Sequence, residues 1–366
     1  MRTSLRTLRT FAAFAATLFH CALLCAVANA AEPYVTNVVA KQRYPWNGKV
    51  DISFEVVGNL EANLPEGKVA ELSVTMTDQK TGKTYAATNL TGDIEPTEGI
   101  RHVIWDMTAQ GVQVYSPEAV FTVAYLQKEP LYRVIDISGG SEAEQYSVSF
   151  LRAVPAGGWS DEYKTDNIVL RRIDGTNGVY YAGIFEVTQA QWDKVMGGTS
   201  TGTTPKDNVS YNTIRGNANT YNWPTSTEVD PTSFIGKLRQ KTGLTMLDLP
   251  SEAEWEFAAR AGVTTEWLCG DSDTGLAEYA WYSEKDGSTH GVGLKNPNAW
   301  ELYDVHGNVW EWCLDLYVSG KSGRVLRGGA YSNVASVCAF AYRSSTSPSY
   351  NWYSHGLRLF CRPGSN

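Results

Sequence analysis

Apolar and polar residues alternate in short segments through the first third of the chain. Residues 50–56, 72–76 and 120–125 each carry apolar side chains at every second position, which is the pattern of a strand with one buried face. Turn-forming residues around Gly82 and Pro96 separate the segments. Short strands with regular turns predict an all-β sandwich of the immunoglobulin or fibronectin kind over residues 31–128. Because such sandwiches serve many functions, a spacer or adhesion role is the default expectation.

Three segments of the second half show helical spacing and clear starts. Residues 188–191 and 251–254 are capping boxes, in which a Thr or Ser and a Gln or Glu three positions later satisfy free backbone N–H groups. Asp230 followed by Pro231 predicts the third helix start. The expected helix ends are glycines, Gly197, Gly243 and Gly262. Three acidic residues near one start are assigned to capping and dipole roles rather than catalysis, namely Glu252, Glu254 and Glu256.

The first thirty residues have the pattern of a secretory signal. Three arginines lie within residues 2–9, a largely apolar run covers residues 11–27, and Ala28-Asn29-Ala30 is a small-residue cleavage site. A retained membrane anchor is the alternative, but the apolar run is short and ends in the cleavage signal. We expect a signal peptide over residues 1–30, cleavage near Ala30, and a secreted or periplasmic protein. No later stretch is apolar over the length that a membrane span needs.

The chain is acidic. Its formal net charge is −8, and loss of three arginines with no acidic residue among residues 1–30 gives −8 − 3 = −11 for the mature chain. Nucleic acids and anionic lipids select basic surfaces, so neither is an expected partner. The chain also holds 12 Trp and 20 Tyr, side chains whose apolar body and polar end suit recognition surfaces.

Four cysteines remain outside the signal segment: Cys269, Cys313, Cys338 and Cys361. An even number in an oxidising compartment predicts disulfides, and four cysteines allow three pairings, among which the sequence does not decide. A bond between Cys338 and Cys361 is favoured because both flank one C-terminal loop. Zinc is not expected, since the chain has no Cys-x-x-Cys motif and its histidines are scattered.

Residues 298–312 combine three tryptophans, acidic side chains and a Gly-Asn turn. Asp304 and Glu311 lie seven positions apart around Gly307, so a turn there could bring both carboxylates together with main-chain carbonyls between them. Oxygen ligands of this kind suit a hard cation such as calcium, which takes about 6–8 of them. The alternative is a Trp-rich turn with two solvated acids.

Five motifs follow one another along the second half. They are Phe-Glu-Val-Thr-Gln at residues 185–189, Leu-Pro-Ser-Glu-Ala-Glu-Trp-Glu-Phe-Ala-Ala-Arg-Ala-Gly at 249–262, the Trp-Glu-Trp segment that ends at 312, Arg-Val-Leu-Arg-Gly-Gly-Ala-Tyr at 324–331, and Gly-Leu-Arg-Leu at 356–359. In this order the chain resembles the formylglycine-generating enzyme, or sulfatase-modifying factor, family from about residue 132 to 363. The resemblance implies an irregular C-type-lectin-like domain over residues 131–366, and so an α+β chain overall.

The resemblance also implies a chemistry that can be checked residue by residue. Enzymes of the family oxidise a sulfatase cysteine to formylglycine with molecular oxygen and copper, which two cysteines hold shortly after the Arg-Gly-Gly motif. Copper(I) is a soft ion that prefers thiolates. Here Ala330 stands at the family's serine position, Asn333 at its first cysteine and Val334 at its histidine. Only the second cysteine, Cys338, is kept.

A lone thiol cannot form a bis-thiolate site, so copper binding and formylglycine generation are not expected, and Cys338 is expected in a disulfide. An oxidoreductase stays the alternative, as a formylglycine-generating type or another metal-dependent oxidase acting on protein or small-molecule thiols. One form of it would be a two-His-one-carboxylate metal site built from His290, His306 and Asp304. Whether the chain is an enzyme is therefore left open.

In the family the turn at residues 304–311 binds a structural calcium ion. The resemblance places side-chain ligands at Asp304 and Glu311 and main-chain carbonyl ligands at Gly307 and Val309. Calcium is therefore the expected cofactor, and its expected role is structural.

Residues 344–355 form an uncharged stretch in which eleven of the twelve are Ser, Thr, Tyr, Asn, Trp or His. Aromatic rings supply contact area and small polar residues supply adaptable hydrogen bonds, a combination typical of binding surfaces. The tail also resembles C-type-lectin-like proteins diversified by retroelements, in which such residues lie between fixed framework positions. We predict that a glycan or protein is bound through five residues, Tyr331, Asn333, Tyr350, Trp352 and Tyr353. A solvated loop of turn-forming residues is the alternative.

Overall fold

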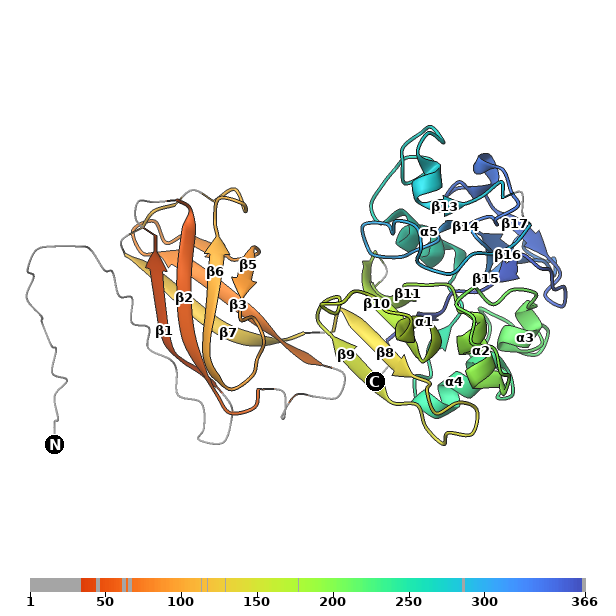
Figure 1. The fold of residues 1–366 in the computed structure, drawn as a ribbon, viewed down its shortest axis with the longest axis horizontal. Coiled ribbons are helices and arrows are strands. Elements are labelled where there is room, and N and C mark those ends of the chain that lie inside the picture. The colour runs from red at the N-terminus through yellow and green to blue at the C-terminus, as the bar shows by residue number, and fades with distance from the viewer. Residues whose placement is uncertain are drawn as a thin grey trace, which may run out of the picture. The chain divides into compact units, whose positions relative to one another are not determined.

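The computed structural model describes residues 34–43, 47–60, 64, 68–112, 114–116, 118–128, 130–176, 178–284 and 287–363. The chain divides into two compact units, Met1–Glu129 and Pro130–Asn366 (Figure 1). The signal peptide predicted over residues 1–30 lies outside the described residues. Antiparallel sheets and short helices make the chain α+β, as predicted. Within the described residues, no helix has the length and apolar character needed to cross a membrane.

The first unit consists of two antiparallel sheets that share one core. Its strands are β1 (Tyr34–Gln42), β2 (Lys49–Val57), β3 (Val69–Asp78), β4 (Thr84–Ala86), β5 (Leu90–Gly92), β6 (Gly99–Asp106) and β7 (Ala119–Lys128). The sheet orders are β1-β2-β6-β5 and β4-β3-β7. Side chains from both sheets, including Phe54, Met76 and Trp105, form one buried cluster. Burial alternates strictly along β2, and all three segments with period-two alternation are strands, which confirms that part of the sequence prediction.

The second unit is built on a six-stranded sheet of order β12-β19-β11-β10-β8-β9. Its strands are β8 (Tyr132–Asp136), β9 (Val148–Leu151), β10 (Asn167–Gly175), β11 (Gly178–Gly183), β12 (Leu247–Asp248) and β19 (Phe360–Cys361). Strand β19 comes last along the described chain, yet it lies inside this sheet, between β11 and β12. Both of its pairings are antiparallel.

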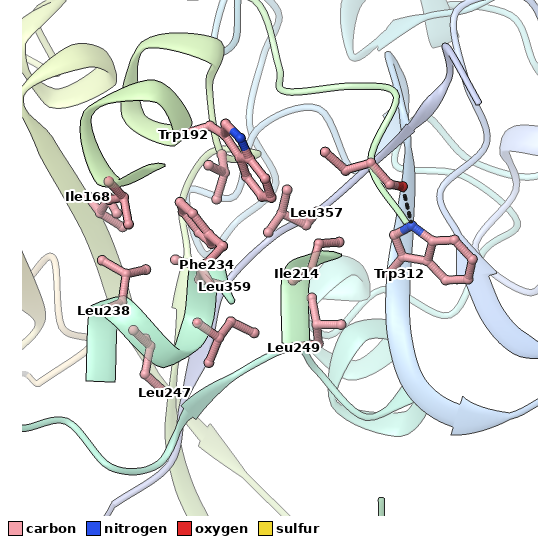
Figure 2. Packing of buried hydrophobic residues seen from close by; sticks show 14 of the residues in the cluster. Ile168, Trp192, Ile214, Phe234, Leu238, Leu247, Leu249, Trp312, Leu357 and Leu359 are labelled. Carbon is pink, nitrogen blue, oxygen red and sulfur yellow. Dashed lines mark hydrogen bonds between the residues drawn. The ribbon is translucent and has the colours of Figure 1, made fainter. Parts of the chain in front are cut away.

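Five short helices pack beside this sheet: α1 (Glu162–Thr165), α2 (Gln189–Met196), α3 (Tyr211–Arg215), α4 (Phe234–Thr242) and α5 (Glu252–Arg260). Figure 2 shows the apolar core where α2, α3 and α4 meet the strands. The rings of Trp192 and Phe234 stack there with centroids 4.6 Å apart. Trp312 is fully buried nearby and donates its indole N–H to the carbonyl of Val209 at 3.0 Å. This packing fixes the helices to the strand that contains Trp312, residues 310–316.

That strand belongs to a second sheet, of order β17-β16-β15-β18. Its members are β15 (Trp310–Leu316), β16 (Arg324–Arg327), β17 (Ser344–Thr346) and β18 (His355–Gly356). A two-stranded parallel sheet joins β13 (Ala280–Trp281) to β14 (His306–Gly307). Two 3-10 turns, η1 (Leu276–Glu278) and η2 (Ala335–Cys338), complete the described elements. Loops make up most of the remainder of this half, as the family resemblance implies.

Helix ends follow local chemistry with two departures from the prediction. Helix α5 ends with Ala261, not Gly262, in the left-handed C-cap conformation. The capping boxes at Thr188 and Ser251 are both formed, which confirms the predicted starts of α2 and α5. The start of α4 predicted at Asp230 is wrong, because Ser233 caps this helix by accepting the N–H of Gly236 at 3.1 Å. Asp230 instead accepts the N–H of Thr232 at 2.8 Å. The turn after Asp230 satisfies its carboxylate locally, so the helix begins three residues later than predicted.

The acidic residues of α5 are all structural. Glu254 accepts the N–H of Ser251 at 2.8 Å and pairs with Arg362. Glu252 pairs with Arg343 at 2.5 Å, and Glu256 pairs with Arg260 at 2.8 Å. These contacts agree with the assignment of the three glutamates to structure rather than catalysis.

The predicted disulfides are not formed. All four cysteines of the described chain are free thiols. Cys361 lies in β19, opposite Tyr181 and Leu247, whereas Cys338 packs against Gly329 and Ala330 in η2. The two cysteines flank one loop in the sequence, but that loop is attached elsewhere along its length, so one end lies in the 3-10 turn η2 and the other in strand β19.

Candidate functional site

The turn that carries the site has an unusual backbone. Asp304, Gly307 and Asn308 all have positive φ, at 56°, 85° and 57°, where residues other than glycine are uncommon. Asn308 is held in this conformation by its side chain, because its carboxamide oxygen accepts the N–H of His290 at 3.1 Å and its nitrogen donates to Glu186 at 2.7 Å. The turn brings the Asp304 and Glu311 carboxylates into one buried region, as the sequence predicted, and adds the Glu186 carboxylate to them.

Glu311 is neutralised by an arginine from the end of the chain. Its carboxylate lies 2.7 Å from the Arg358 guanidinium, and both side chains are 1% exposed. The indole N–H of Trp255 donates to the same carboxylate at 2.6 Å. Arg358 also donates to the main-chain carbonyls of Gly183 at 3.0 Å and Tyr303 at 2.8 Å. This one guanidinium therefore links β15 to the end of β11 and to the turn.

Glu186 completes the buried group. Its carboxylate accepts the Asn308 side-chain amide at 2.7 Å and the main-chain N–H of Val309 at 3.1 Å. Complete burial raises its pKa well above the usual range, and the nearby charges of Asp304 and Glu311 raise it further. Glu186 was not predicted as a site residue from the sequence. Its place in the Phe-Glu-Val-Thr-Gln motif was the one feature of the sequence that pointed to it.

Asp304 is the group with unused bonding capacity. One carboxylate oxygen accepts the N–H of Gly293 at 2.7 Å, whereas the other, Oδ1, is buried without a hydrogen-bond partner. Burial raises the pKa of Asp304 to about 6. An orphaned buried oxygen must be matched by a proton, a water molecule or a cation. Oδ1 is therefore compatible with the predicted calcium site.

The second predicted carboxylate ligand of calcium, Glu311, is already engaged. Both of its oxygens accept from Arg358, which leaves this carboxylate little capacity for a cation. Among the described residues no cluster of three or more His, Cys, Asp or Glu side chains is placed to hold a metal. Calcium would thus depend on Asp304 and on the carbonyls of Gly307 and Val309, and it stays a prediction.

The two histidines of the alternative two-His-one-carboxylate metal site make other contacts. His306 accepts the N–H of Leu268 at Nε2 (3.2 Å), and its Nδ1 lies 2.7 Å from the carbonyl of Cys338, so the ring is neutral with its proton on Nδ1. Burial lowers the pKa of His306 to about 4. His290 stacks on Trp281 with centroids 3.8 Å apart. The described geometry gives no support to a two-His-one-carboxylate centre.

The positions equivalent to the family's copper site form an ordinary turn. Ala330 is fully buried, and its N–H is donated to the side-chain oxygen of Asn333 at 2.9 Å. Val334 is exposed to solvent. Burial raises the pKa of Cys338 to about 12, so this residue is a protonated thiol at neutral pH. One buried thiol beside an asparagine and a valine cannot supply the two thiolates that copper(I) needs.

The uncharged loop is attached to the framework through its main chain. The carbonyls of Pro348 and Trp352 accept the N–H groups of Asn212 and Asn208, each at 3.0 Å. Further along, the carbonyl of Ser354 accepts the N–H of Trp310 at 2.7 Å. The side chains project outward: Tyr350 is 45% exposed, Trp352 52% and Tyr353 64%. The fold holds the loop by its backbone and leaves its large side chains in solvent.

Aromatic contacts continue from the core to this exposed group. The buried ring of Trp312 meets His355 at 5.6 Å, and His355 meets Tyr350 at 6.0 Å. Tyr350 stacks with Trp352 at 6.0 Å and 13°, and Trp352 meets Tyr353 at 6.1 Å. We name this series, Trp312, His355, Tyr350, Trp352 and Tyr353, the aromatic ladder. Sequence reasoning found its exposed members but missed His355, whose role depends on packing.

Tyr331 and Asn333, the other predicted ligand residues, are part-buried. Their carbonyls accept the N–H groups of Glu284 and Ser283, each at 2.8 Å. The N–H of Tyr331 is donated to the carbonyl of Asn308 at 2.9 Å. Ser354 bonds to Trp310, which lies two positions after Asn308. The two predicted parts of the ligand face, residues 331–333 and the loop at residues 350–353, are therefore both attached close to the short segment 308–310.

The second unit is thus an α+β domain with three distinguishing features: a Trp-rich turn, a buried Glu–Arg pair and an Arg-Gly-Gly turn. The family model described as "Sulfatase-modifying factor enzyme 1-like domain" matches residues 151–362. The match covers more than half of the chain, so the chain belongs to this family.

The chain is similar to relatives with quite different descriptions. The chain is 25% identical over 221 residues to "Chaperone protein LppX" of Paenibacillus barcinonensis, covering 49% of this chain and 79% of the relative. It is 33% identical over 141 residues to the formylglycine-generating enzyme of Streptomyces coelicolor, covering 30% of this chain and 45% of that enzyme. The chain thus spans less than half of that enzyme's length. "Inactive C-alpha-formylglycine-generating enzyme 2" of Mus musculus is 36% identical over 100 residues, which is 24% of this chain and 32% of the relative.

Among solved structures, "Treponema denticola variable protein 1" is similar with a TM-score of 0.43 and 27% identity, over 54% of this chain and 96% of that one. PvdO from Pseudomonas aeruginosa is similar with a TM-score of 0.43 and 20% identity, over 64% of this chain and 95% of that one.

Proposed function

We propose that the chain is an exported, secreted or periplasmic, binding protein whose second unit holds a glycan or protein ligand. The observation that carries the proposal is the way in which residues 344–355 are held. Their main chain is hydrogen-bonded to residues 208, 212 and 310, and the three largest side chains of the loop are exposed. Contiguous exposed apolar groups of this kind are typical of interaction sites. The main chains of Tyr331 and Ser354 both bond to residues 308–310, which supports the inclusion of Tyr331 and Asn333 in the proposed ligand face.

The test compares ligand capture with stability in one variant. The purified chain is applied to defined glycan and protein arrays, and so is a double variant carrying Trp352→Ala and Tyr353→Ala. Truncation of an aromatic anchor typically costs about 2 kcal/mol or more of binding free energy, so the double variant is expected to lose capture and to keep its melting temperature. A combined loss of capture and of thermal stability would mean that the two rings belong to the structural core and would overturn the proposal.

Copper-dependent oxidation is the activity that this proposal excludes. Protein loaded with copper(I) is expected to leave the cysteine of a Cys-x-Pro-x-Arg peptide unchanged, because Cys338 lacks a partner thiolate. Mass spectrometry of the peptide, with a no-enzyme control, detects the aldehyde product. Formation of that aldehyde above the control would restore the enzyme interpretation.

A structural calcium ion is part of the proposal and is tested by melting. A ligand that binds only the folded state stabilises it by RT ln(1 + [L]/Kd), about 2.7 kcal/mol at a hundredfold excess over Kd. Calcium is therefore expected to raise the melting temperature of the chain relative to chelator, and Asp304→Asn is expected to remove most of that rise. Asp273→Asn, at an exposed position, is the matched control. Superimposable curves in calcium and in chelator would contradict the prediction.

A further inference from the structure

We infer that the ligand held by the aromatic ladder is a neutral saccharide, bound against the exposed rings of Tyr350 and Trp352. The inference rests on the binding function proposed above and names the class of ligand. It uses three properties of the loop: the stacking of its rings, the absence of charge, and the way in which the rings are held.

The rings offer flat apolar surface in solvent. Tyr350 and Trp352 stack within 13° of parallel, and about half of each side chain is exposed. The face of an aromatic ring carries partial negative charge. The C–H groups of a pyranose ring carry partial positive charge and lie together on one side of the sugar. A sugar can therefore cover such a ring with apolar contact while its hydroxyl groups point sideways to polar neighbours.

Those neighbours are uncharged hydrogen-bonding groups. Asn351 donates to the side-chain oxygen of Asn208 at 2.8 Å, and the hydroxyls of Ser347 and Ser349 lie 3.1 Å apart. Amides and hydroxyls both donate and accept, as sugar hydroxyls do. No Lys, Arg, Asp or Glu occurs in residues 344–355, and His355 is buried and its pKa is lowered to about 4. A charged ligand would lose hydration here without gaining an ion pair from the loop.

The ladder also reduces the entropy that a ligand must overcome. Tyr350 packs edge-on against His355, which packs edge-on against the fully buried Trp312. Main-chain bonds from Asn208 and Asn212 hold the backbone on both sides of Tyr350. Ordering a free side chain on binding costs conformational entropy, and these contacts order the rings before the ligand arrives. Weak contacts with a small ring are then sufficient for recognition.

The experiment uses the full mature chain. It is applied to arrays of neutral glycans, acidic glycans and proteins, and the affinity for any neutral glycan found is then measured in solution by calorimetry. Trp352→Ala is expected to weaken that affinity at least about 30-fold, whereas Trp352→Phe, which keeps a ring, should retain most of it. Tyr115→Ala removes a ring of similar exposure, 54%, from the first unit and is expected to leave the glycan affinity unchanged. Melting temperatures accompany each variant.

The outcomes separate the saccharide inference from the binding function. Neutral glycans that bind the parent chain and the Tyr115 variant, but not the Trp352→Ala variant, support both. Binding only to proteins or only to acidic glycans, lost in the Trp352→Ala variant, would overturn the saccharide inference and leave the binding function standing. A neutral glycan whose affinity ignores Trp352→Ala would also overturn the inference. No ligand on any array would overturn both.

Discussion

Replacement of Arg358 by methionine is expected to destabilise the second unit by about 3–5 kcal/mol, because it leaves the Glu311 carboxylate buried without its partner. Both side chains of this pair are 1% exposed. The Glu186 and Asp304 carboxyl groups lie in the same buried region, so the variant removes the cation that offsets their charge. The main-chain carbonyl of Tyr303 also loses its donor. Buried polar groups without partners add to the cost.

The control for Arg358→Met is a second Arg–Glu pair at the surface. Arg343 lies 2.5 Å from Glu252, but its side chain is 41% exposed. Exposed pairs of this kind contribute about 0–1 kcal/mol, so Arg343→Met should change the melting temperature little. At about 2–4 °C per kcal/mol for a unit of this size, Arg358→Met should lower it by roughly 6–20 °C. Equal shifts in the two variants would show that burial of the Glu311 pair has no special weight.

Gly307→Ala is expected to destabilise the second unit by at least about 3 kcal/mol. Gly307 has a φ of 85°, where an alanine is strained. A Cβ at this position would lie 1.9 Å from the carbonyl oxygen of Trp281, which belongs to the paired strand β13. Neither backbone segment can move away without breaking the pairing. Strain and overlap therefore act together.

Gly262→Ala separates these two contributions. Gly262 also has a positive φ, 92°, but no neighbouring atom lies within 4 Å of a Cβ built there. This variant carries the conformational cost alone, about 1–2 kcal/mol, and chemical denaturation of both variants measures the difference. A Gly307→Ala variant no less stable than Gly262→Ala would mean that the β13–β14 pairing yields easily.

Features that depend on neighbouring residues were predictable from the sequence. The capping box at Ser251 needs only a glutamate three positions later, and the alternation along β2 needs only one buried face. The start of α4 was mispredicted because Asp230 has a second local option, the turn to Thr232, that competes with capping. Local chemistry allows Asp230 either to cap the helix or to form the turn, and the packing of the chain selects the turn.

The sequence indicated which carboxylates form the site, but it did not indicate which residue pairs with them. The spacing of Asp304 and Glu311 around Gly307 indicated a turn that gathers carboxylates, and the structure places both in one buried region. Nothing in the sequence indicates that Arg358, 47 positions later, neutralises Glu311. The disulfide prediction failed for a related reason, because proximity of Cys338 and Cys361 along the chain does not determine that one lies in the turn η2 and the other in strand β19. Contacts between distant segments depend on the whole fold.

The position of β19 bears on the order in which the second unit can assemble during synthesis. Translation reaches Phe360 and Cys361 after every other strand of the six-stranded sheet, yet β19 lies between β11 and β12, and Arg358 precedes it by two residues. The sheet therefore stays divided, and Glu311 uncompensated, until these residues have left the ribosome. A chain cut before Arg358 would lose an interior strand of its sheet together with the cation that neutralises Glu311.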